Sequence, residues 1–484
     1  MKLSKLIKSM DVLDVAGPEN VKVLGVAYDS REVKEGWLFV AVSGHQVDGS
    51  AFITQAVSNG AVAVVSESAL HLGSGVAHVQ VPCARTALAE IAHAFYGKIS
   101  KDLSVIGVTG TNGKTTTTYM IRDMLRCAGR RPGLLGTVAY EVGNRSIPAS
   151  RTTPEAPEIH SMFRQMADAG CDAAVLEVSS HALELRRVHK IDFDVAVFTN
   201  LTQDHLDYHK DMETYFDVKA MLFERLKKTG RCAVINCDDP WGCRLIDEKA
   251  IRAEVMTYGF GEKAMVRACD ATLDASGTDF KVETPWGDAD VHLQLLGRFN
   301  IHNALAALAV GGVLGLELHT MVKALAGIAA VPGRLELVAN PGGRQIFVDY
   351  AHTDDALKNV LTTLREICEG RLLVVFGCGG NRDTGKREKM GRAAAELADF
   401  SIVTSDNPRN EEPAAIVADI LNGFSNPDQY EVVLDRREAI EKGVAMMGER
   451  DVLLIAGKGH ETYQEFDGAV VPFDDREMVK GLFQ

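Results

Sequence analysis

Short apolar runs alternate with amphipathic stretches along most of the chain. This alternation predicts strands followed by helices, and repeated strand–helix units favour a mostly parallel sheet. Strands are predicted at the apolar runs 38–42, 61–65, 103–108, 173–178, 195–199, 232–236, 345–348, 372–376, 401–404 and 452–455. Helices are predicted at the stretches with helical apolar spacing, 52–59, 82–95, 115–125, 303–314, 356–367, 386–397, 415–421 and 437–447. The predicted fold class is therefore α/β.

One segment departs from this pattern. Between about 264 and 296 the hydrophobic period changes to two, with turn signals at Ser276-Gly277 and Trp286-Gly287. Such a period predicts an antiparallel excursion. Pro332-Gly333 is the predicted hinge before the strand–helix alternation resumes. A length of 484 residues suggests about three domains, and we place them at 1–101, 102–332 and 333–484.

Composition and charge narrow the class of protein. Apolar residues make up 46% of the chain and charged residues 24%, which is typical of soluble globular proteins. The chain has 52 Lys plus Arg against 66 Asp plus Glu, so the net charge of −14 disfavours nucleic acid as a partner.

The longest apolar run, 304–316, is too short to span a bilayer. We expect no membrane insertion and no signal peptide. The nine cysteines lack zinc or redox spacing, so we expect reduced thiols and a cytoplasmic protein.

A glycine-rich loop at 107–115 follows a predicted strand and opens a predicted helix. It reads Gly-Val-Thr-Gly-Thr-Asn-Gly-Lys-Thr. Glycines let backbone N–H groups close on phosphate oxygens, and a helix N-terminus favours anions. Lys114 would reach the β- and γ-phosphates, and the Thr115 hydroxyl would face Mg²⁺. The strict phosphate-loop pattern has glycine at the position of Val108, so the match is imperfect.

Acidic and imidazole side chains follow the next predicted strands. Glu177 ends the strand predicted at 173–178, and a hard cation between phosphates needs such an oxygen ligand. A helix-capping acid is the alternative interpretation of Glu177. The segment 199–209 offers several acids and histidines, and the sequence does not choose a ligand among them.

Eight short motifs occur in one order along the chain: GVTGTNGKTTT (107–117), LEVSSH (176–181), TNLTQDHLDYH (199–209), NIHNALAA (300–307), PGRLE (332–336), DYAHT (349–353), DNPR (406–409) and GKGHE (457–461). Together they closely resemble the Mur ligase family over almost the whole chain. The resemblance is closest to the members that add the third residue of the peptidoglycan stem peptide.

This resemblance implies a fold and an activity. The fold would comprise a small α/β UDP-sugar domain (1–101), a central P-loop-type ATPase domain (102–332) and a Rossmann-like amino-acid domain (333–484). ATP would activate a carboxylate as an acyl phosphate, and an amine would then attack it to form an amide. The implied substrates are ATP, UDP-N-acetylmuramoyl-L-Ala-D-Glu and meso-diaminopimelate, with L-lysine as the alternative amine. Mg²⁺ would be the cofactor, and the protein would be a monomer in cytoplasmic cell-wall precursor synthesis.

The resemblance also assigns the reaction centre. The implied catalytic residues are Lys114, Glu177, His205 and Lys219. Thr115, Glu177, His205 and Lys219 would hold Mg²⁺, with Lys219 carbamylated because a bare ammonium cannot ligate a cation. The implied ATP-binding residues are Gly110, Thr111, Asn112, Gly113, Lys114, Thr115, Thr116, Asn300, Asn303, Arg334 and Asp349.

Two further sets of contacts follow from the same resemblance. The UDP-sugar-peptide would contact Tyr28, Ser30, His45, Gln46, Val47, Thr152, Thr153, Ser179 and Arg187. Diaminopimelate would contact Arg382, Asp406, Asn407, Pro408, Arg409, Gly457 and Glu461. The chemistry supports Arg409 in this role, because diaminopimelate carries a carboxylate that lysine lacks and a guanidinium can grip it in bidentate fashion. Glu461 would pair with an ammonium group.

Other functions compete with this interpretation. A related ligase could add a different amine or work at another stem-peptide step, and a folate-polyglutamate ligase would be a more distant version. A P-loop kinase or nucleotide-driven switch would need no amine. A non-catalytic UDP-sugar-binding protein would not need Lys114, Glu177, His205 and Lys219 together. Amine-dependent release of ADP distinguishes these possibilities.

Overall fold

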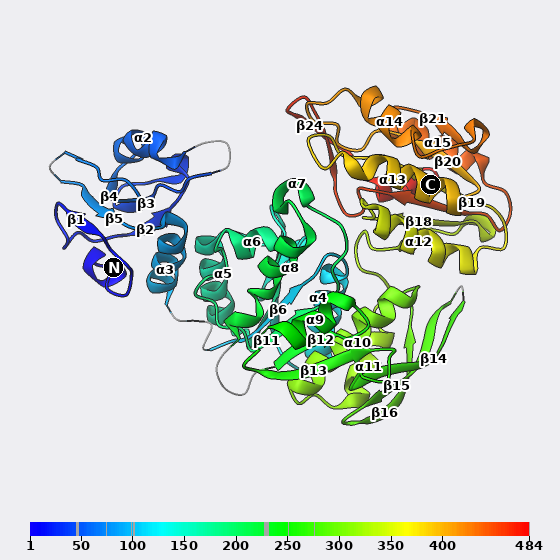
Figure 1. The fold of residues 1–484 in the computed structure, drawn as a ribbon, viewed down its shortest axis with the longest axis horizontal. Coiled ribbons are helices and arrows are strands. Elements are labelled where there is room, and N and C mark those ends of the chain that lie inside the picture. Colours follow the sequence, from blue (N-terminus) through cyan, green and yellow to red (C-terminus); the bar gives the residue numbers. More distant parts are fainter. Residues whose placement is uncertain are drawn as a thin grey trace.

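The computed structural model describes residues 1–44, 48–73, 75–97, 99, 102–226, 232–249, 251–274 and 276–483. These residues form three large sheets that lie from left to right in Figure 1: an N-terminal sheet (blue), a central sheet (cyan to green) and a C-terminal sheet (yellow to red). Helices cover both faces of each sheet. The predicted α/β class with three units is confirmed.

The N-terminal sheet has five strands in the order β1-β5-β4-β3-β2, and only β1 is antiparallel to its neighbour. Its strands are β1 (Asp14–Ala16), β2 (Gly25–Ala27), β3 (Trp37–Val40), β4 (Ala61–Ser66) and β5 (Ala77–Gln80). Its helices are α1 (Leu3–Leu6), α2 (Ile53–Ser58) and α3 (Ala84–Tyr96). Leu38 packs on the α3 side and Phe39 on the α2 side, as the alternation of side chains along a strand requires.

The central sheet has eleven strands in the order β16-β15-β14-β13-β12-β11-β6-β10-β7-β8-β9. The parallel strands are β6 (Ser104–Thr109), β7 (Pro132–Leu135), β10 (Ala173–Glu177), β11 (Val195–Phe198), β12 (Cys232–Asn236), β13 (Glu254–Gly259) and β14 (Val266–Asp274). Antiparallel extensions lie at both ends: β15 (Gly277–Thr284) and β16 (Gly287–Leu293), and β8 (Ala139–Val142) and β9 (Arg145–Pro148). The antiparallel excursion predicted at 264–296 is confirmed, and the sheet is mixed.

Two helical layers sandwich the central sheet. One comprises α4 (Lys114–Cys127), α10 (Arg298–Val313) and α11 (Leu318–Ala326). The other comprises α5 (Ala156–Asp168), α6 (Ser180–Glu184), α8 (Met212–Ala220) and α9 (Pro240–Glu248). The short helix α7 (Leu206–His209) precedes α8. Helix α5 also packs against α3, which joins the N-terminal and central sheets (Figure 1).

The C-terminal sheet has six strands in the order β17-β18-β22-β19-β20-β21, and only β17 is antiparallel. Its strands are β17 (Glu336–Ala339), β18 (Gln345–Asp349), β19 (Leu372–Phe376), β20 (Phe400–Val403), β21 (Tyr430–Val432) and β22 (Val452–Ala456). Its helices are α12 (Asp354–Ile367), α13 (Gly385–Leu397), α14 (Pro413–Leu421), α15 (Arg436–Met446) and α16 (Asp475–Gly481). A separate hairpin, β23 (Tyr463–Phe466) and β24 (Ala469–Pro472), lies beside it.

The largest difference between a predicted and an observed helix start is at α10. Helix α10 begins at Arg298 rather than at 303, because Gly297 at φ 98° ends the preceding segment and the polar residues after it still adopt helical geometry. Asn300 is one such residue, and its amide donates to the carbonyl of Leu296 at 2.9 Å. The boundaries at 101/102 and 332/333 stay predictions.

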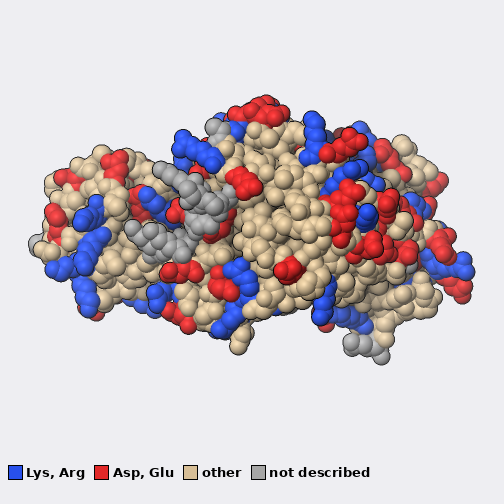
Figure 2. All heavy atoms as spheres, turned by 90° about the horizontal axis from the view of Figure 1, so that it is seen from below, with Lys and Arg blue, Asp and Glu red and all other residues tan. Residues whose placement is uncertain are grey.

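The cysteines, the surface charges and the helices agree with what the composition and the apolar runs predicted. Each of the nine cysteines, all within the described residues, is a free thiol. On the face shown in Figure 2, positive and negative side chains of the described residues are interspersed. None of the helices in the described ranges has the length and apolar character needed to cross a membrane.

Candidate active site

The glycine-rich loop joins β6 to α4 at the carboxyl edge of the central sheet. Gly113 has φ 84°, and a Cβ there would lie 2.4 Å from Oδ1 of Asn303. Only glycine accommodates this conformation and this close approach. Lys114 Nζ donates to the carbonyls of Gly110 at 3.0 Å and Thr111 at 2.7 Å, and burial lowers its pKa. The loop therefore concentrates a cation and a helix N-terminus at one place, as a phosphate site requires.

Glu177 lies at the end of β10, beside this loop. Its Oε2 accepts hydrogen bonds from the hydroxyls of Thr115 at 3.0 Å and Thr137 at 2.9 Å, and its side chain is buried. Ser179, not Glu177, accepts the capping hydrogen bond of α6. The helix-capping alternative for Glu177 is therefore wrong. Its carboxylate faces the hydroxyl of Thr115, which is a predicted ligand of Mg²⁺.

Lys219 is buried against the same loop. It extends from α8, is 1% exposed, and its Nζ donates to the carbonyl of Gly110 at 2.8 Å. Burial, together with the charge of Lys114, pushes the pKa of Lys219 well below its usual value of 10.5. An unprotonated amine is the form that can react with carbon dioxide, so the environment suits a carbamate.

His205 lies at the start of α7, with φ 55°. Its Nε2 is 3.4 Å from Asp204, and its ring centroid is 5.1 Å from that of His181. Within the described residues no three His, Cys, Asp or Glu side chains cluster closely enough to hold a metal ion by themselves. The available oxygens of Thr115 and Glu177 fit Mg²⁺ only if nucleotide phosphates supply further ligands, which is how this cation is usually bound.

A cavity of about 460 Å³ lies between the phosphate loop, α10 and α12. Asn303, Arg334 and Asp349 line it, whereas Asn300 lies behind Asn303 and receives a hydrogen bond from it at 3.0 Å. Arg334 comes from the C-terminal unit, and its Nη2 donates to the Thr115 hydroxyl at 3.0 Å. Asp349 accepts from the backbone N–H of Ala351 at 2.6 Å, and burial raises its pKa.

A second cavity, of about 510 Å³, lies where the N-terminal and central sheets meet. Tyr28 and Ser30 line it, and the Tyr28 hydroxyl donates to Glu158 of α5 at 2.8 Å. The predicted contacts His45, Gln46 and Val47 lie outside the described residues. Near this cavity, Arg187 donates to the carbonyl of Thr153 at 2.9 Å. The Thr153 hydroxyl lies 3.3 Å from that of Ser179, so these three predicted contacts form one cluster.

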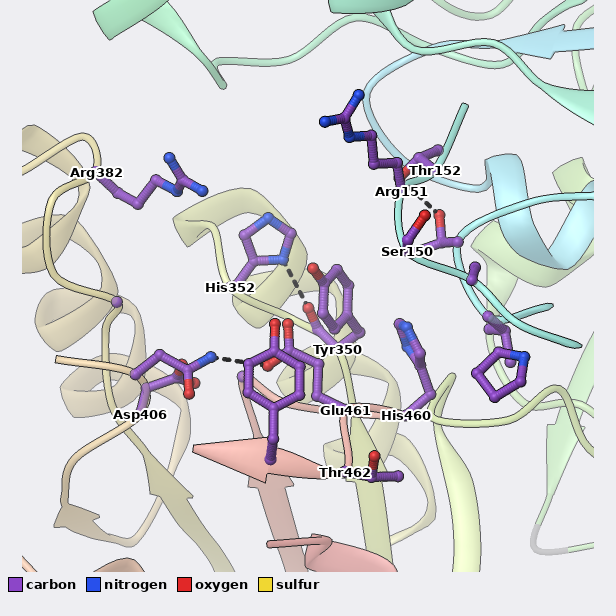
Figure 3. Close-up of a pocket in the computed structure, with 18 of the residues that line it drawn as sticks. Ser150, Arg151, Thr152, Tyr350, His352, Arg382, Asp406, His460, Glu461 and Thr462 are labelled. Atoms are coloured by element: carbon purple, nitrogen blue, oxygen red, sulfur yellow. Dashed lines mark hydrogen bonds between the residues drawn. The ribbon is translucent and has the colours of Figure 1, made fainter. Parts of the chain in front are cut away.

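A third cavity, of about 990 Å³, lies between the central and C-terminal units. Figure 3 shows Ser150, Arg151 and Thr152 on one side, and Arg382 and Asp406 across from them. His181 and His205 also line it from the central unit, and Asn407, Arg409, Gly457 and Glu461 line it from the C-terminal unit. The structure thus brings together residues that lie more than 250 positions apart.

Arg409 is held in a defined orientation at this cavity. It has φ 52°, its Nη1 donates to the carbonyl of Gly380 at 2.7 Å, and its Nε is 3.2 Å from Glu465. Asn407 donates to Glu461 at 2.9 Å, and burial raises the pKa of Glu461. Pro408 lies in the same loop, and its carbonyl accepts a hydrogen bond from the backbone N–H of Glu411 at 3.0 Å.

Sequence reasoning missed several side chains in these cavities. Tyr350, His352 and His460 line the cavity of about 990 Å³. Asn200, Tyr258 and His302 line the cavity of about 460 Å³ beside the phosphate loop, here called the nucleotide cavity. The Nδ1–H of His352 donates to the carbonyl of Tyr350 at 2.8 Å, and burial lowers the pKa of His352 to about 4 (Figure 3). For Tyr350, His352, His460 and Asn200 the available signal was a position after the end of a predicted strand. Tyr258 and His302 had no such signal, since they lie within β13 and α10.

Comparisons with known proteins agree with this geometry. Family models match at residues 22–96 (Mur ligase family, catalytic domain), 108–311 (Mur ligase middle domain) and 333–459 (Mur ligase, glutamate ligase domain). The UDP-N-acetylmuramoyl-L-alanyl-D-glutamate--2,6-diaminopimelate ligase of Geobacter metallireducens is 44% identical, covering 100% of this chain and 98% of the relative. The protein of that name from Bacillus velezensis is also 44% identical, covering 99% and 98%.

A solved structure shows the same similarity in three dimensions. It is described as a UDP-N-acetylmuramoyl-L-alanyl-D-glutamate--2,6-diaminopimelate ligase, is 33% identical and has a TM-score of 0.69. The match covers 100% of this chain and 99% of that structure. Full-length identity at this level, with matching models in all three units, means that the chain belongs to the Mur ligase family.

Proposed function

We propose that this chain is an ADP-forming amide ligase that joins meso-2,6-diaminopimelate to the D-glutamate of UDP-N-acetylmuramoyl-L-Ala-D-Glu, in peptidoglycan precursor synthesis. The observation that carries the proposal is the 990 Å³ cavity, where Thr152 and His205 face Arg409 and Glu461. The phosphate loop lies beside it, so a nucleotide, a carboxylate and an amine can meet there. The names of relatives that are 44% identical over the full chain support the same activity.

The first step is phosphoryl transfer. A carboxylate oxygen of D-Glu bonds to the γ-phosphorus while the bond to the bridging oxygen of ADP breaks. Lys114 and the N–H groups of the loop stabilise the charge on the phosphates. Thr115, Glu177, His205 and carbamylated Lys219 would hold Mg²⁺, which would neutralise phosphate charge when bound. Gly110–Thr116, Asn300, Asn303, Arg334 and Asp349 would hold the rest of the nucleotide.

The second step is acyl transfer. The amine of diaminopimelate attacks the acyl carbon, phosphate leaves with the electrons of the broken carbon–oxygen bond, and the amine loses a proton. Arg382, Asp406, Asn407, Arg409, Gly457 and Glu461 would hold the amine substrate, with backbone from Pro408. Contact between the central and C-terminal units keeps water from the acyl phosphate.

Arg409 supports diaminopimelate over lysine as the amine. Its guanidinium lies at the cavity, where it can bind a substrate carboxylate in addition to Glu465. A lysine substrate would not supply that second carboxylate. Ligation of L-lysine is the alternative that the experiment must exclude.

The test measures ADP release from ATP with UDP-N-acetylmuramoyl-L-Ala-D-Glu and Mg²⁺, in parallel reactions with meso-diaminopimelate, L-lysine or no amine. We expect release with diaminopimelate alone, and a product heavier by that residue. Release with lysine would support the ligase activity but contradict the role of Arg409 in recognising diaminopimelate. Amine-independent release with a phosphorylated product would instead indicate a kinase.

We also propose the roles of the three units: UDP-sugar binding by 1–101, ATP use by 102–332 and amino-acid binding by 333–484. Tyr28, Ser30, Thr152, Thr153, Ser179 and Arg187 would contact the UDP-sugar-peptide. A cytoplasmic monomer is the proposed form, since ATP and nucleotide-linked sugars are cytoplasmic metabolites. Cell fractionation and light scattering test these two points.

A further inference from the structure

A fully buried ion pair lies beneath the proposed amino-acid subsite, and the mechanism above does not use it. Arg436 begins α15 and Asp475 begins α16, and both side chains are 0% exposed. Nε and Nη2 of Arg436 lie 2.8 and 2.7 Å from the two oxygens of Asp475. Burying two charges is costly, and an apolar pair of similar size often gives equal stability. Stability alone is therefore a weak reason for charges at this place.

The remaining donors of Arg436 reach the backbone of two loops. Nη2 donates to the carbonyl of Ala456 at 2.9 Å, and Nη1 donates to the carbonyl of Ser405 at 3.4 Å. Ala456 ends β22 and Ser405 follows β20, so both carbonyls lie where strand pairing stops. Buried carbonyls at such points need another donor. Arg436 supplies it to both, and so joins the two loops at their bases.

The same two loops carry the proposed contacts to the amine substrate. The first loop contains Asn407 and Arg409, and the second contains Glu461. Their upper parts are also tied together, because Nζ of the fully buried Lys458 lies 3.1 Å from Oδ1 of Asn407 and 3.0 Å from Oε2 of Glu461. A displacement at the bases must therefore move the side chains that face the cavity.

We propose that Arg436 is a positioning residue of the amino-acid subsite. It holds the loops 405–409 and 456–461 at a fixed separation, and thereby sets the geometry of Asn407, Arg409 and Glu461 without touching substrate. This inference rests on the proposed function, since it takes the cavity to bind a diamino dicarboxylic acid. An apolar residue could fill the same space but could not bond both carbonyls.

Two variants test the role. Arg436→Lys keeps the charge, but a single ammonium cannot replace the bidentate pair and both carbonyl bonds. Arg436→Met/Asp475→Leu removes both charges together, so that no buried charge is left without a partner. The control is Asp451→Asn, because the buried Asp451 pairs with the half-exposed Arg371 at 2.8 Å just before β22, at the opposite end of the same sheet.

We expect the KM for meso-diaminopimelate to rise about tenfold or more in both Arg436 variants, as small misplacements of binding groups cause. The KM values for ATP and for the nucleotide-linked peptide should stay within about twofold, because those sites lie on other loops. Asp451→Asn should lower Tm without changing any KM.

Equal increases of all three KM values, or a fall in Tm with an unchanged KM for diaminopimelate, would overturn the positioning role. If the double variant does not fold, Arg436→Lys decides the question by the same KM comparison. A wild-type protein that shows no diaminopimelate-dependent ADP release would instead contradict the proposed function, whatever the variants do.

Discussion

Burial gives Lys219 its chemical character. The side chain lies 4.5 Å from the ring of Tyr215 and bonds a carbonyl of the phosphate loop, with Lys114 nearby. Desolvation and a like charge both disfavour the ammonium form, so the pKa falls. The position of Lys219 in the fold, and not its residue type, therefore favours the unprotonated amine, which is the form that can react with carbon dioxide.

Lys219→Ala should reduce ligation by about a hundredfold or more, because the proposed cation loses a ligand. The Tm should change by less than about 5 °C, since one methylene chain is lost from a domain this large. Lys249→Ala is the control, because Lys249 lies near α8 but is half-buried at the surface, where it pairs with Asp217. Near-normal activity of Lys219→Ala would sink the carbamate assignment. Steady-state rates and thermal unfolding provide both readouts.

Arg409→Ala should weaken diaminopimelate use far more than ATP use. A lost charge-assisted hydrogen bond is worth about 2 kcal/mol, which corresponds to about thirtyfold in KM. Arg392→Ala serves as the control, since Arg392 is an exposed arginine of the same unit that pairs with Glu388. Initial rates at varied concentrations of each substrate give the two KM values. If both rise equally in Arg409→Ala, the arginine supports the structure and not the amine.

At the scale of elements, α4 carries the proposed phosphate site. The glycine-rich loop leads directly into its first turn, and its buried face packs on the central sheet. Two glycines in the left-handed conformation, Gly113 and Gly129, flank the helix. The two glycines share a conformation but not an environment. Gly113 is pressed against Asn303, whereas a Cβ at Gly129 would meet nothing within 4 Å.

Gly113→Ala and Gly129→Ala therefore form a matched pair. Each should cost about 1–2 kcal/mol of unfolding free energy, because alanine is strained in the left-handed region. Only Gly113→Ala should also raise the KM for ATP, by about tenfold or more, since its Cβ displaces Asn303 from the nucleotide cavity. Denaturant unfolding and ATP titration separate the two effects. An unchanged KM for ATP in Gly113→Ala would mean that nucleotide binds elsewhere.

At the scale of the whole molecule, the candidate site is divided between two units that touch at polar contacts and at an apolar patch, where Leu296 packs into the C-terminal core. Asn112 donates to Asp355 at 3.1 Å, and Lys389 donates to Gln203 at 2.7 Å. Together with the bond from Arg334 to Thr115, these contacts place the C-terminal unit over the phosphate loop. Relative motion of units is common at interfaces within one chain that are not large and hydrophobic.

Asp355→Ala should weaken this closure. Loss of the bond to Asn112 is worth about 1 kcal/mol, so we expect the KM for ATP to rise about fivefold. Asp354→Ala is the neighbouring control on the same helix, without the contact to Asn112. Equal behaviour of both variants in ATP titrations would show that the contact has no part in nucleotide binding.

The sequence by itself determined the local elements and the chemistry at their ends. The strand at 372–376 and the phosphate loop were predictable because hydrophobic period and glycine spacing are local properties. The resemblance to the Mur ligase family extended this to residue roles such as those of Glu177 and Arg409. It could not show which loops approach each other.

Only the tertiary structure decided burial, partners and the composition of the cavities. Lys219 reads as an ordinary helical lysine until α8 packs it against the loop at Gly110. Asn300 and Asn303 are equivalent in the sequence motif, yet Asn303 lines the cavity and Asn300 lies behind it. Arg436 has no sequence signal, because its role comes from two strand ends and one helix that meet in space. Such contacts depend on long-range packing, which the pattern of any one segment does not contain.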